Sequence, residues 1–122
     1  MPYLTLSKSN VDGSCINETQ FEFLLKDKKQ LEILVLYIIQ YTTQCKHMKN
    51  SLKEMIDENL CDVIIVEVDM IDFQHREEIG RLHAFPCVQI HREGEFKESY
   101  IGSNPSQLFT QIQTPNFYNN TQ

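Results

Sequence analysis

The sequence contains no apolar run long enough to cross a membrane. Its longest such run covers residues 33–39, whereas a spanning helix needs about 20 apolar residues. The first residues, MPYLTLSKS, also lack a basic stretch followed by an apolar core, so we expect no signal peptide. The cytoplasm is therefore the expected compartment, and we expect no membrane partner.

A surplus of positive charge is absent as well. The chain has 11 lysines and arginines against 17 aspartates and glutamates, which gives a formal net charge of -6 at pH 7. Nucleic acids and anionic lipid surfaces bind proteins mainly through basic side chains that neutralise phosphates. The composition thus argues against nonspecific binding to nucleic acid or to a membrane surface.

Cysteines at metal-binding spacing are missing too. No two of the four cysteines form a CxxC motif, and the four histidines do not fall at zinc-ligand spacing beside them. We therefore expect no metal and no cofactor, and a reducing cytoplasm would keep the thiols free. The cysteines are Cys15, Cys45, Cys61 and Cys87.

The chain has the length and composition of one soluble domain. A chain of 122 residues with 41% hydrophobic content buries roughly two-thirds of its unfolded surface, which is enough for one core. The last nine residues, TPNFYNNTQ, are polar and contain a proline. We expect one domain over residues 1–113 and a flexible tail over residues 114–122.

Hydrophobic spacing predicts strands that alternate with helices. Residues 31–39 and 63–68 are nearly all apolar, which is typical of strands buried on both faces. An edge strand is expected at residues 3–7, and a hairpin at residues 87–91 and 95–101. Helices are expected at residues 18–28, 44–59, 72–82 and 104–112, the first capped by Asn17 and the last by Asn104.

This order predicts an α/β protein with helices on both faces of a mixed sheet. The sheet is expected to have five strands and to be flanked by four helices. The hairpin would add antiparallel strands to an otherwise parallel arrangement.

Several local patterns together resemble thioredoxin. The apolar strand 31–39 leads directly into YTTQCK at residues 41–46, and the strand VIIVEVD ends in Asp69. Phe85-Pro86 opens the next strand where thioredoxins have a cis-proline, and Ile101-Gly102 precedes the last helix. The resemblance covers roughly residues 19–112. It implies a thioredoxin-like fold and a shallow substrate groove beside the 41–46 turn.

The departures from that family carry more information. The family motif is Trp-Cys-Gly-Pro-Cys-Lys, whereas this chain has Thr42 in place of the first cysteine and keeps only Cys45. The buried acid that the family has six residues before the first cysteine is Leu36 here, and the chain has no tryptophan. A threonine hydroxyl does not ionise at neutral pH without a dedicated base. The usual dithiol cycle therefore lacks its attacking thiolate and its proton acceptor.

Cys45 admits more than one interpretation. At the second-cysteine position a thiol lies about one turn inside the helix, where it acts as a small buried hydrophobic group. Thr42-x-x-Cys45 is also similar to the TxxC of peroxiredoxins, but that family has a proline where this chain has Ile38. A third hypothesis pairs Cys45 with Cys87, which follows Pro86, in a disulfide or around a soft metal.

We weigh three functions on these grounds. The first is a non-redox binding module that holds a protein or peptide partner in the groove. The second is a single-cysteine thiol-disulfide oxidoreductase that uses Cys45, with or without Cys87, and reacts with glutathione or peroxide. The third is a remnant fold that serves as a subunit of a larger assembly. By resemblance, the groove residues are Tyr41, Thr42, Ala84, Phe85, Pro86, Ile101 and Gly102.

Overall fold

The computed structural model describes most of the chain. The described residues are 3–8, 14–27, 32–39, 42–57, 63–82, 84–102, 104 and 106–108, with the backbone alone described at 55–57.

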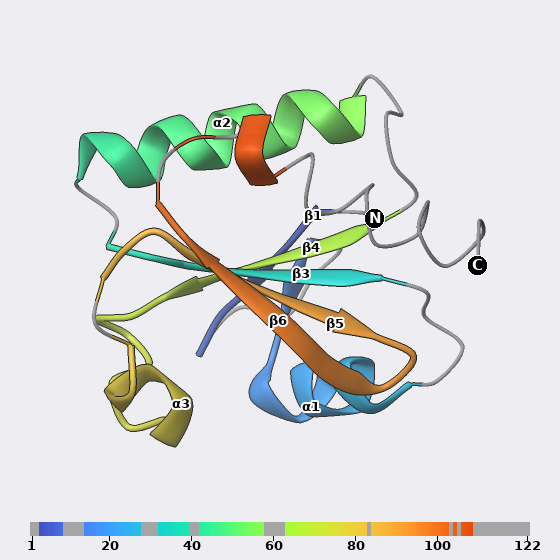
Figure 1. The fold of residues 1–122 in the computed structure, drawn as a ribbon. Coiled ribbons are helices and arrows are strands. Elements are labelled where there is room, and N and C mark those ends of the chain that lie inside the picture. Colours follow the sequence, from blue (N-terminus) through green and yellow to red (C-terminus); the bar gives the residue numbers. More distant parts are fainter. Residues whose placement is uncertain are drawn as a thin grey trace.

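A six-stranded mixed sheet forms the centre of the molecule (Figure 1). The strand order is β2-β1-β4-β3-β5-β6. The four strands from β2 to β3 are mutually parallel, and β5 and β6 add antiparallel pairing to β3. The strands are β1 (Tyr3–Leu6), β2 (Cys15–Ile16), β3 (Ile33–Ile38), β4 (Ile64–Asp69), β5 (Cys87–Arg92) and β6 (Glu95–Ile101).

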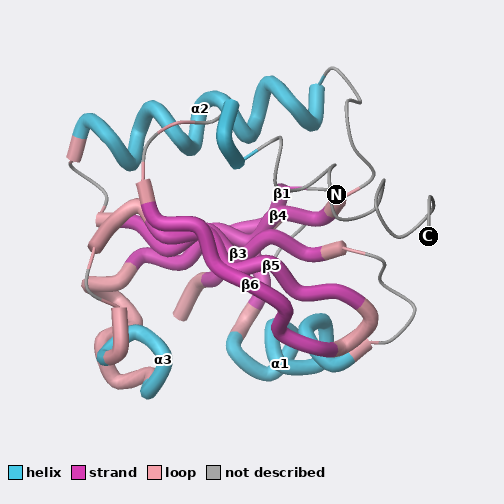
Figure 2. Tube along the Cα trace, viewed as in Figure 1, coloured by secondary structure: helices cyan, strands magenta, loops and turns pink. Residues whose placement is uncertain are grey.

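Helices cover both faces of this sheet (Figure 2). The long helix α2 (Thr43–Asp57) lies on one face, together with a short helical segment at residues 106–108. Helices α1 (Glu18–Lys26) and α3 (Glu77–Gly80) lie on the other face. The result is a three-layer arrangement. In the part of the chain that is described, no helix is both long and apolar enough to cross a membrane.

The start of α1 shows how local sequence sets an element. The side chain of Asn17 accepts a hydrogen bond from the backbone N–H of Gln20, and the Gln20 side chain accepts one from the N–H of Asn17. This reciprocal capping satisfies two donors that a helix start leaves unpaired. The predicted cap at Asn17 is therefore confirmed. The predicted cap at Asn104 is confirmed as well, because its side chain accepts from the backbone N–H groups of Ser106 and Gln107.

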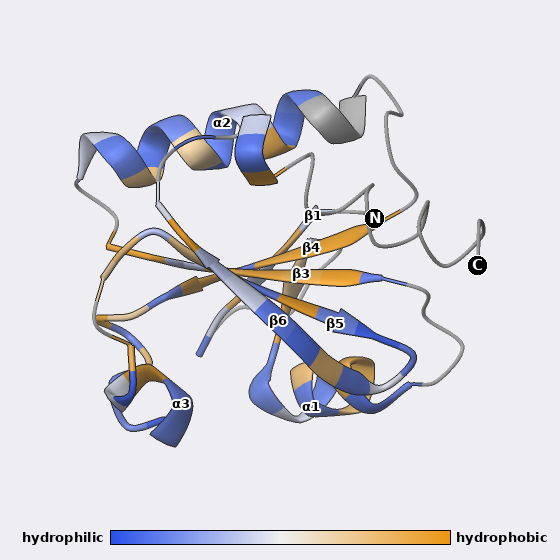
Figure 3. Ribbon diagram, in the orientation of Figure 1, coloured by the Kyte–Doolittle hydropathy of each residue, from blue (hydrophilic) through white to orange (hydrophobic). Residues whose placement is uncertain are grey.

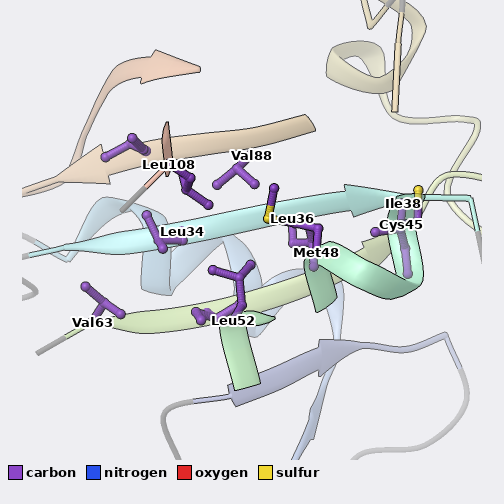
Figure 4. Close-up of a cluster of buried hydrophobic side chains, with 11 residues drawn as sticks. Leu34, Leu36, Ile38, Cys45, Met48, Leu52, Val63, Val88 and Leu108 are labelled. Atoms are coloured by element: carbon purple, nitrogen blue, oxygen red, sulfur yellow. The ribbon is translucent and has the colours of Figure 1, made fainter. Parts of the chain in front are cut away.

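Strands β3 and β4 lie inside the sheet and are buried by helices on both sides. Figure 3 shows much of β3 and β4 in the hydrophobic colour and much of the α2 ribbon in the hydrophilic colour. Because side chains alternate along a strand, β3 contributes residues to two separate apolar clusters, one on each face of the sheet. The α2-side cluster comprises Leu34, Leu36, Ile38, Cys45, Met48, Leu52, Val63, Ile65, Val88, Ile90 and Leu108 (Figure 4). The α1-side cluster comprises Leu6, Phe21, Ile33, Val35, Tyr37, Val66, Val68, Phe73, Ile79 and Cys87.

The predicted fold class is confirmed, and three of its details change. Strand β1, expected at the edge of the sheet, lies inside it because it pairs with both β2 and β4. The sheet has six strands instead of five, because the two residues of β2 pair with β1. The helix expected at residues 72–82 is reduced to the four residues of α3, and residues 70–76 form turns. Arg76 has an extended backbone (φ -74°, ψ 135°), which interrupts any helix there. The last expected helix is described only at residues 106–108, and the boundary predicted at residue 113 lies outside the described residues.

Candidate functional site

Strand pairing brings distant parts of the sequence together where β3 and β6 end and β5 begins. Tyr37 of β3 pairs with Cys87 of β5, and Cys87 pairs in turn with Ile101 of β6. Just past this row, the backbone N–H of Gly102 donates to the carbonyl of Pro86 over 3.2 Å. In Figure 1 the start of α2 lies at the same edge. Three of the predicted groove residues, Pro86, Ile101 and Gly102, thus lie together near the C-terminal end of β3, whereas Tyr41 lies outside the described residues.

Thr42 closes the turn between β3 and α2. The carbonyl of Ile39 accepts hydrogen bonds from the Thr42 backbone N–H at 3.2 Å and from its Oγ1 at 3.1 Å. The Thr42 carbonyl in turn accepts from the N–H of Lys46 at 3.1 Å, the first bond of the helix. Thr42 therefore holds the position before the helix, and its hydroxyl is occupied as a donor to the backbone.

Cys45 lies in the first turn of α2 and is fully buried, with 0% of its surface exposed. Its side chain belongs to the α2-side cluster beside Ile38 and Met48, as Figure 4 shows. The Sγ atom accepts one hydrogen bond, from the backbone N–H of Ile39, at 3.4 Å. The sulfur thus packs as a core atom with a single polar contact to the turn.

Cys87 is fully buried too, but it lies in the α1-side cluster on the opposite face of the sheet. Burial raises the pKa of the Cys87 thiol to about 11, so the thiol stays protonated at neutral pH. The sheet itself separates Cys45 from Cys87, and both thiols are free. Converging side chains, which the hypothesis of a disulfide or shared metal requires, are therefore not found for this pair.

Among the remaining metal-ligating side chains the described residues show no cluster. They contain no group of three or more histidines, cysteines or carboxylates that could hold a metal ion. Cys15 is a free thiol of intermediate exposure, and Cys61 lies outside the described residues. His75 contacts Glu18 at 3.0 Å, and burial lowers the pKa of His91.

The segment before β5 presents apolar residues beside the end of β6. The Phe85–Pro86 peptide bond is cis. Phe85 is half-buried and packs against both apolar clusters, whereas Ala84 is exposed and Pro86 is buried. Ile101 leaves 52% of its surface exposed. We call this set the Phe85 surface: Thr42, Ala84, Phe85, Pro86, Ile101 and Gly102.

Gly102 has a backbone conformation that other residues rarely adopt, with φ at +143°. A Cβ atom at this position would approach the hydroxyl oxygen of Tyr100 to 3.0 Å. That hydroxyl donates to the carbonyl of Asn104 at 3.1 Å and accepts from its N–H at 3.2 Å. Glycine therefore lets the chain leave β6 close to Pro86 without displacing Tyr100.

A buried carboxylate lies on the α2 side of β4. Glu67 is only 4% exposed, and its Oε1 accepts from the Tyr3 hydroxyl at 2.7 Å and from Lys49 at 3.0 Å. Burial, followed by the charge of Glu67, raises the pKa of Tyr3. This cluster did not emerge from the sequence, although an acid inside the apolar run VIIVEV was the available signal.

A second charged cluster lies on the other face and centres on Arg76. Its guanidinium, 11% exposed, bonds to Glu18 at 3.0 Å, to Glu78 at 2.7 Å and to Glu22. Burial alone would lower the pKa of Arg76, but the hydrogen bonds with Glu22 and Glu78 raise it. Arg76 therefore stays charged and ties the turn before α3 to α1. No local sequence pattern indicates the contacts of Arg76 with Glu18 and Glu22, which join residues 58 and 54 positions apart.

The strand order, the position of α2 and the Pro86 turn define an α/β protein with a thioredoxin fold. Mitochondrial thioredoxin 3 from Saccharomyces cerevisiae is 22% identical with a TM-score of 0.71, and the match covers 91% of this chain and 94% of that one. Thioredoxin from Trypanosoma brucei brucei is 18% identical with a TM-score of 0.71, with coverage of 93% and 90%. Schistosoma mansoni thioredoxin pre-protein is 21% identical with a TM-score of 0.70, with coverage of 92% and 97%.

The family assignment follows from the sequence itself. A family model for thioredoxin matches residues 13–114, which is most of the chain. This chain therefore belongs to the thioredoxin family. No curated protein matches its sequence.

Proposed function

We propose that this chain is a binding module of the thioredoxin family that works without dithiol chemistry. Its ligand is an extended segment of a protein or peptide partner, held on the Phe85 surface. Tyr41 precedes Thr42 in the sequence and lies outside the described residues, and we add it to this surface as the sequence predicts.

The observation that carries the proposal is the state of Thr42 and Cys45. By resemblance, Thr42 stands where the family has its attacking thiol, and its hydroxyl donates to the Ile39 carbonyl. The remaining thiol is fully buried in the α2-side cluster. A thiol must be accessible as thiolate to attack a disulfide, and neither group meets that requirement.

The Phe85 surface has the chemistry of a peptide contact. It combines an exposed aliphatic side chain, Ile101, with a half-buried aromatic ring, Phe85. Backbone groups adjoin both, at the end of β6 and at the start of β5. Extended peptides bind through main-chain hydrogen bonds for affinity and side-chain contacts for specificity, and aromatic residues often dominate such interfaces.

Selection of binding peptides tests this surface. A library of displayed 12-residue peptides is selected on the whole protein, and one selected peptide is then titrated against variants. Ile101→Asp should weaken its binding at least about tenfold, because a charge would replace an apolar contact. Phe96→Asp is the matched control, since Phe96 lies on the same strand and is 54% exposed. Equal effects of both variants would reject the Phe85 surface as the site.

One observation favours the alternative of a single-cysteine oxidoreductase that uses Cys45. The backbone N–H of Ile39 points at Sγ, and a donor in this position stabilises a thiolate. Alkylation with iodoacetamide, mapped by mass spectrometry, separates the two functions. We expect Cys15 to react in the native protein and Cys45 to react only in urea. Native alkylation of Cys45, with insulin reduction that disappears in Cys45→Ser, would establish the oxidoreductase instead.

Thr42→Cys tests the alignment of the turn with the family motif. The variant places two cysteines at CxxC spacing, and we expect it to gain measurable reduction of insulin disulfides in the presence of a thiol reductant. Leu36 supplies no proton acceptor, so the gain should stay well below that of a typical thioredoxin. A folded variant without any activity would contradict the assignment of Thr42 to the attacking position.

A further inference from the structure

Three lysines form a line along one side of α2. Lys46, Lys49 and Lys53 are spaced by three and four residues, which places them on one side of a helix. Lys46 and Lys53 are exposed, and the Lys49 side chain is 30% exposed. We call this line the α2 ridge. From Lys46 to Lys53 it extends about 10 Å at the rise of an α-helix.

The ridge lysines are paired differently from the described arginines. Arg76, Arg81 and Arg92 each have a glutamate partner, as does Lys97, whereas Lys8 and Lys26 have no carboxylate partner among the described side chains. On the ridge, Glu67 pairs with Lys49, while Lys46 and Lys53 have no carboxylate partner among the described side chains. The one acid among the described side chains of α2 is Glu54, which points about 100° away from Lys53.

Contacts with the sheet hold two of these lysines in place. Lys49 bonds to Glu67 on β4, and the ammonium of Lys53 lies 5.0 Å from the centre of the Tyr3 ring on β1. Tyr3 in turn donates to Glu67. Lys49 and Lys53 are like charges four residues apart, an arrangement that destabilises an isolated helix. The contacts with Glu67 and Tyr3 therefore fix the positions of Lys49 and Lys53, although their proximity does not stabilise the helix itself.

We propose that the α2 ridge is a docking surface for a short acidic segment of a protein partner. The ridge begins one residue after Cys45, at the end of α2 that borders the Phe85 surface. Two or three lysines provide fewer phosphate contacts than the 6–10 of a typical nucleic-acid binder, which favours a short acidic peptide over a nucleic acid. An acidic peptide needs about three extended residues to span the ridge.

Fluorescence anisotropy with fluorescein-labelled decaglutamate tests the proposal on the whole chain. We expect saturable binding that weakens steeply as salt rises, since exposed charges are screened. The double variant K46E/K53E should weaken binding about tenfold or more. The control K26E/K97E changes the net charge by the same amount at lysines outside α2 and should stay within about twofold of the native protein.

Each other outcome counts against the ridge. Equal losses in both double variants would show a response to net charge alone, and no binding of decaglutamate at low salt would reject the proposal. Tighter binding of a labelled ten-nucleotide uridine RNA would assign the ridge to nucleic acid instead. The inference is independent of the peptide site, because Ile101→Asp tests the Phe85 surface while leaving the α2 ridge intact. Circular dichroism confirms that each variant is folded.

Discussion

The two faces of the sheet each bury a charged cluster beside an apolar one, but they do so in opposite ways. On the α2 face a single carboxylate, Glu67, takes one lysine and one tyrosine hydroxyl. On the other face a single guanidinium, Arg76, takes three carboxylates. The rigid fork of arginine suits such multiple pairing, whereas lysine acts as a point charge on a flexible stem. Three ion pairs thus surround the cation beside the short α3, whereas the long α2 adds the single Lys49–Glu67 pair to its apolar contacts with the sheet.

The largest effect on stability is expected from the buried apolar side chains, which both faces of the sheet contain. Phe21→Ala should lower the free energy of unfolding by about 3–5 kcal/mol, because the ring is fully buried. Leu52→Ala, equally buried on the α2 face, should cost about 2–5 kcal/mol. Urea denaturation measures both. If either variant lost less than about 1 kcal/mol, the cluster that contains it would not be a packed core.

Arg76→Met should lower the free energy of unfolding by about 2 kcal/mol, since it leaves three carboxylates together without their cation. Arg81→Met is the matched control. Arg81 pairs with Glu77 one turn along the helix, but its side chain is 73% exposed, so its removal should cost less than about 0.5 kcal/mol. Equal losses would mean that the Arg76 cluster stabilises the fold no more than a surface ion pair does.

The stability of the native protein should fall as pH rises from 9 to 11, in part because of Cys87. The unfolded chain releases the thiol proton near its ordinary pKa of 9.0, while the folded chain keeps it until about 11. Unfolding therefore releases a proton, at up to about 1.4 kcal/mol per pH unit. Tyr3 and Tyr37, whose pKa values burial raises, steepen the decline above pH 10. Urea titrations of the native protein and Cys87→Ala should differ in slope, and identical slopes would contradict the assignment.

The smallest effect on stability is expected from the turn between β3 and α2. Thr42→Val removes the hydrogen bond to the Ile39 carbonyl and should cost about 1 kcal/mol. Thr43→Val, at an exposed position one residue later, should cost no more than a few tenths of a kcal/mol. Thermal denaturation of the two variants measures the difference. A neutral Thr42→Val would mean that the hydroxyl does not hold the turn closed.

Much of the fold was predictable because its signals are local. The runs at residues 31–39 and 63–68 are apolar over nearly their whole length, and they became the two strands buried on both faces. The capping pair at Asn17 and Gln20, three residues apart, marks the start of α1 within four consecutive positions. For the same reason the place of Cys45, just inside a helix that follows a buried strand, could be read from YTTQCK.

The features that were missed depend on contacts far apart in the sequence. The side of the sheet on which Cys87 lies follows from the pairing of Tyr37 with Cys87. Strands that are apolar on both faces carry no alternation from which that register could be read. The short α3 depends on Arg76 reaching α1, which outweighs the local helix preference of residues 72–82. Glu67 likewise finds Tyr3 only after β1 and β4 pair.

Strand β1 lies between β2 and β4, so its four residues are interior to the sheet although they stand near the beginning of this sequence. Tyr3 pairs with Ile65, 62 positions away. On the ribosome, β1 therefore emerges several seconds before the strand that it must join, at typical rates of 5–20 residues per second. Closing so large a loop is entropically slow. We expect the sheet to be completed on this side only after α2 and β4 have been synthesised, with the Tyr3–Glu67 contact among the last to form.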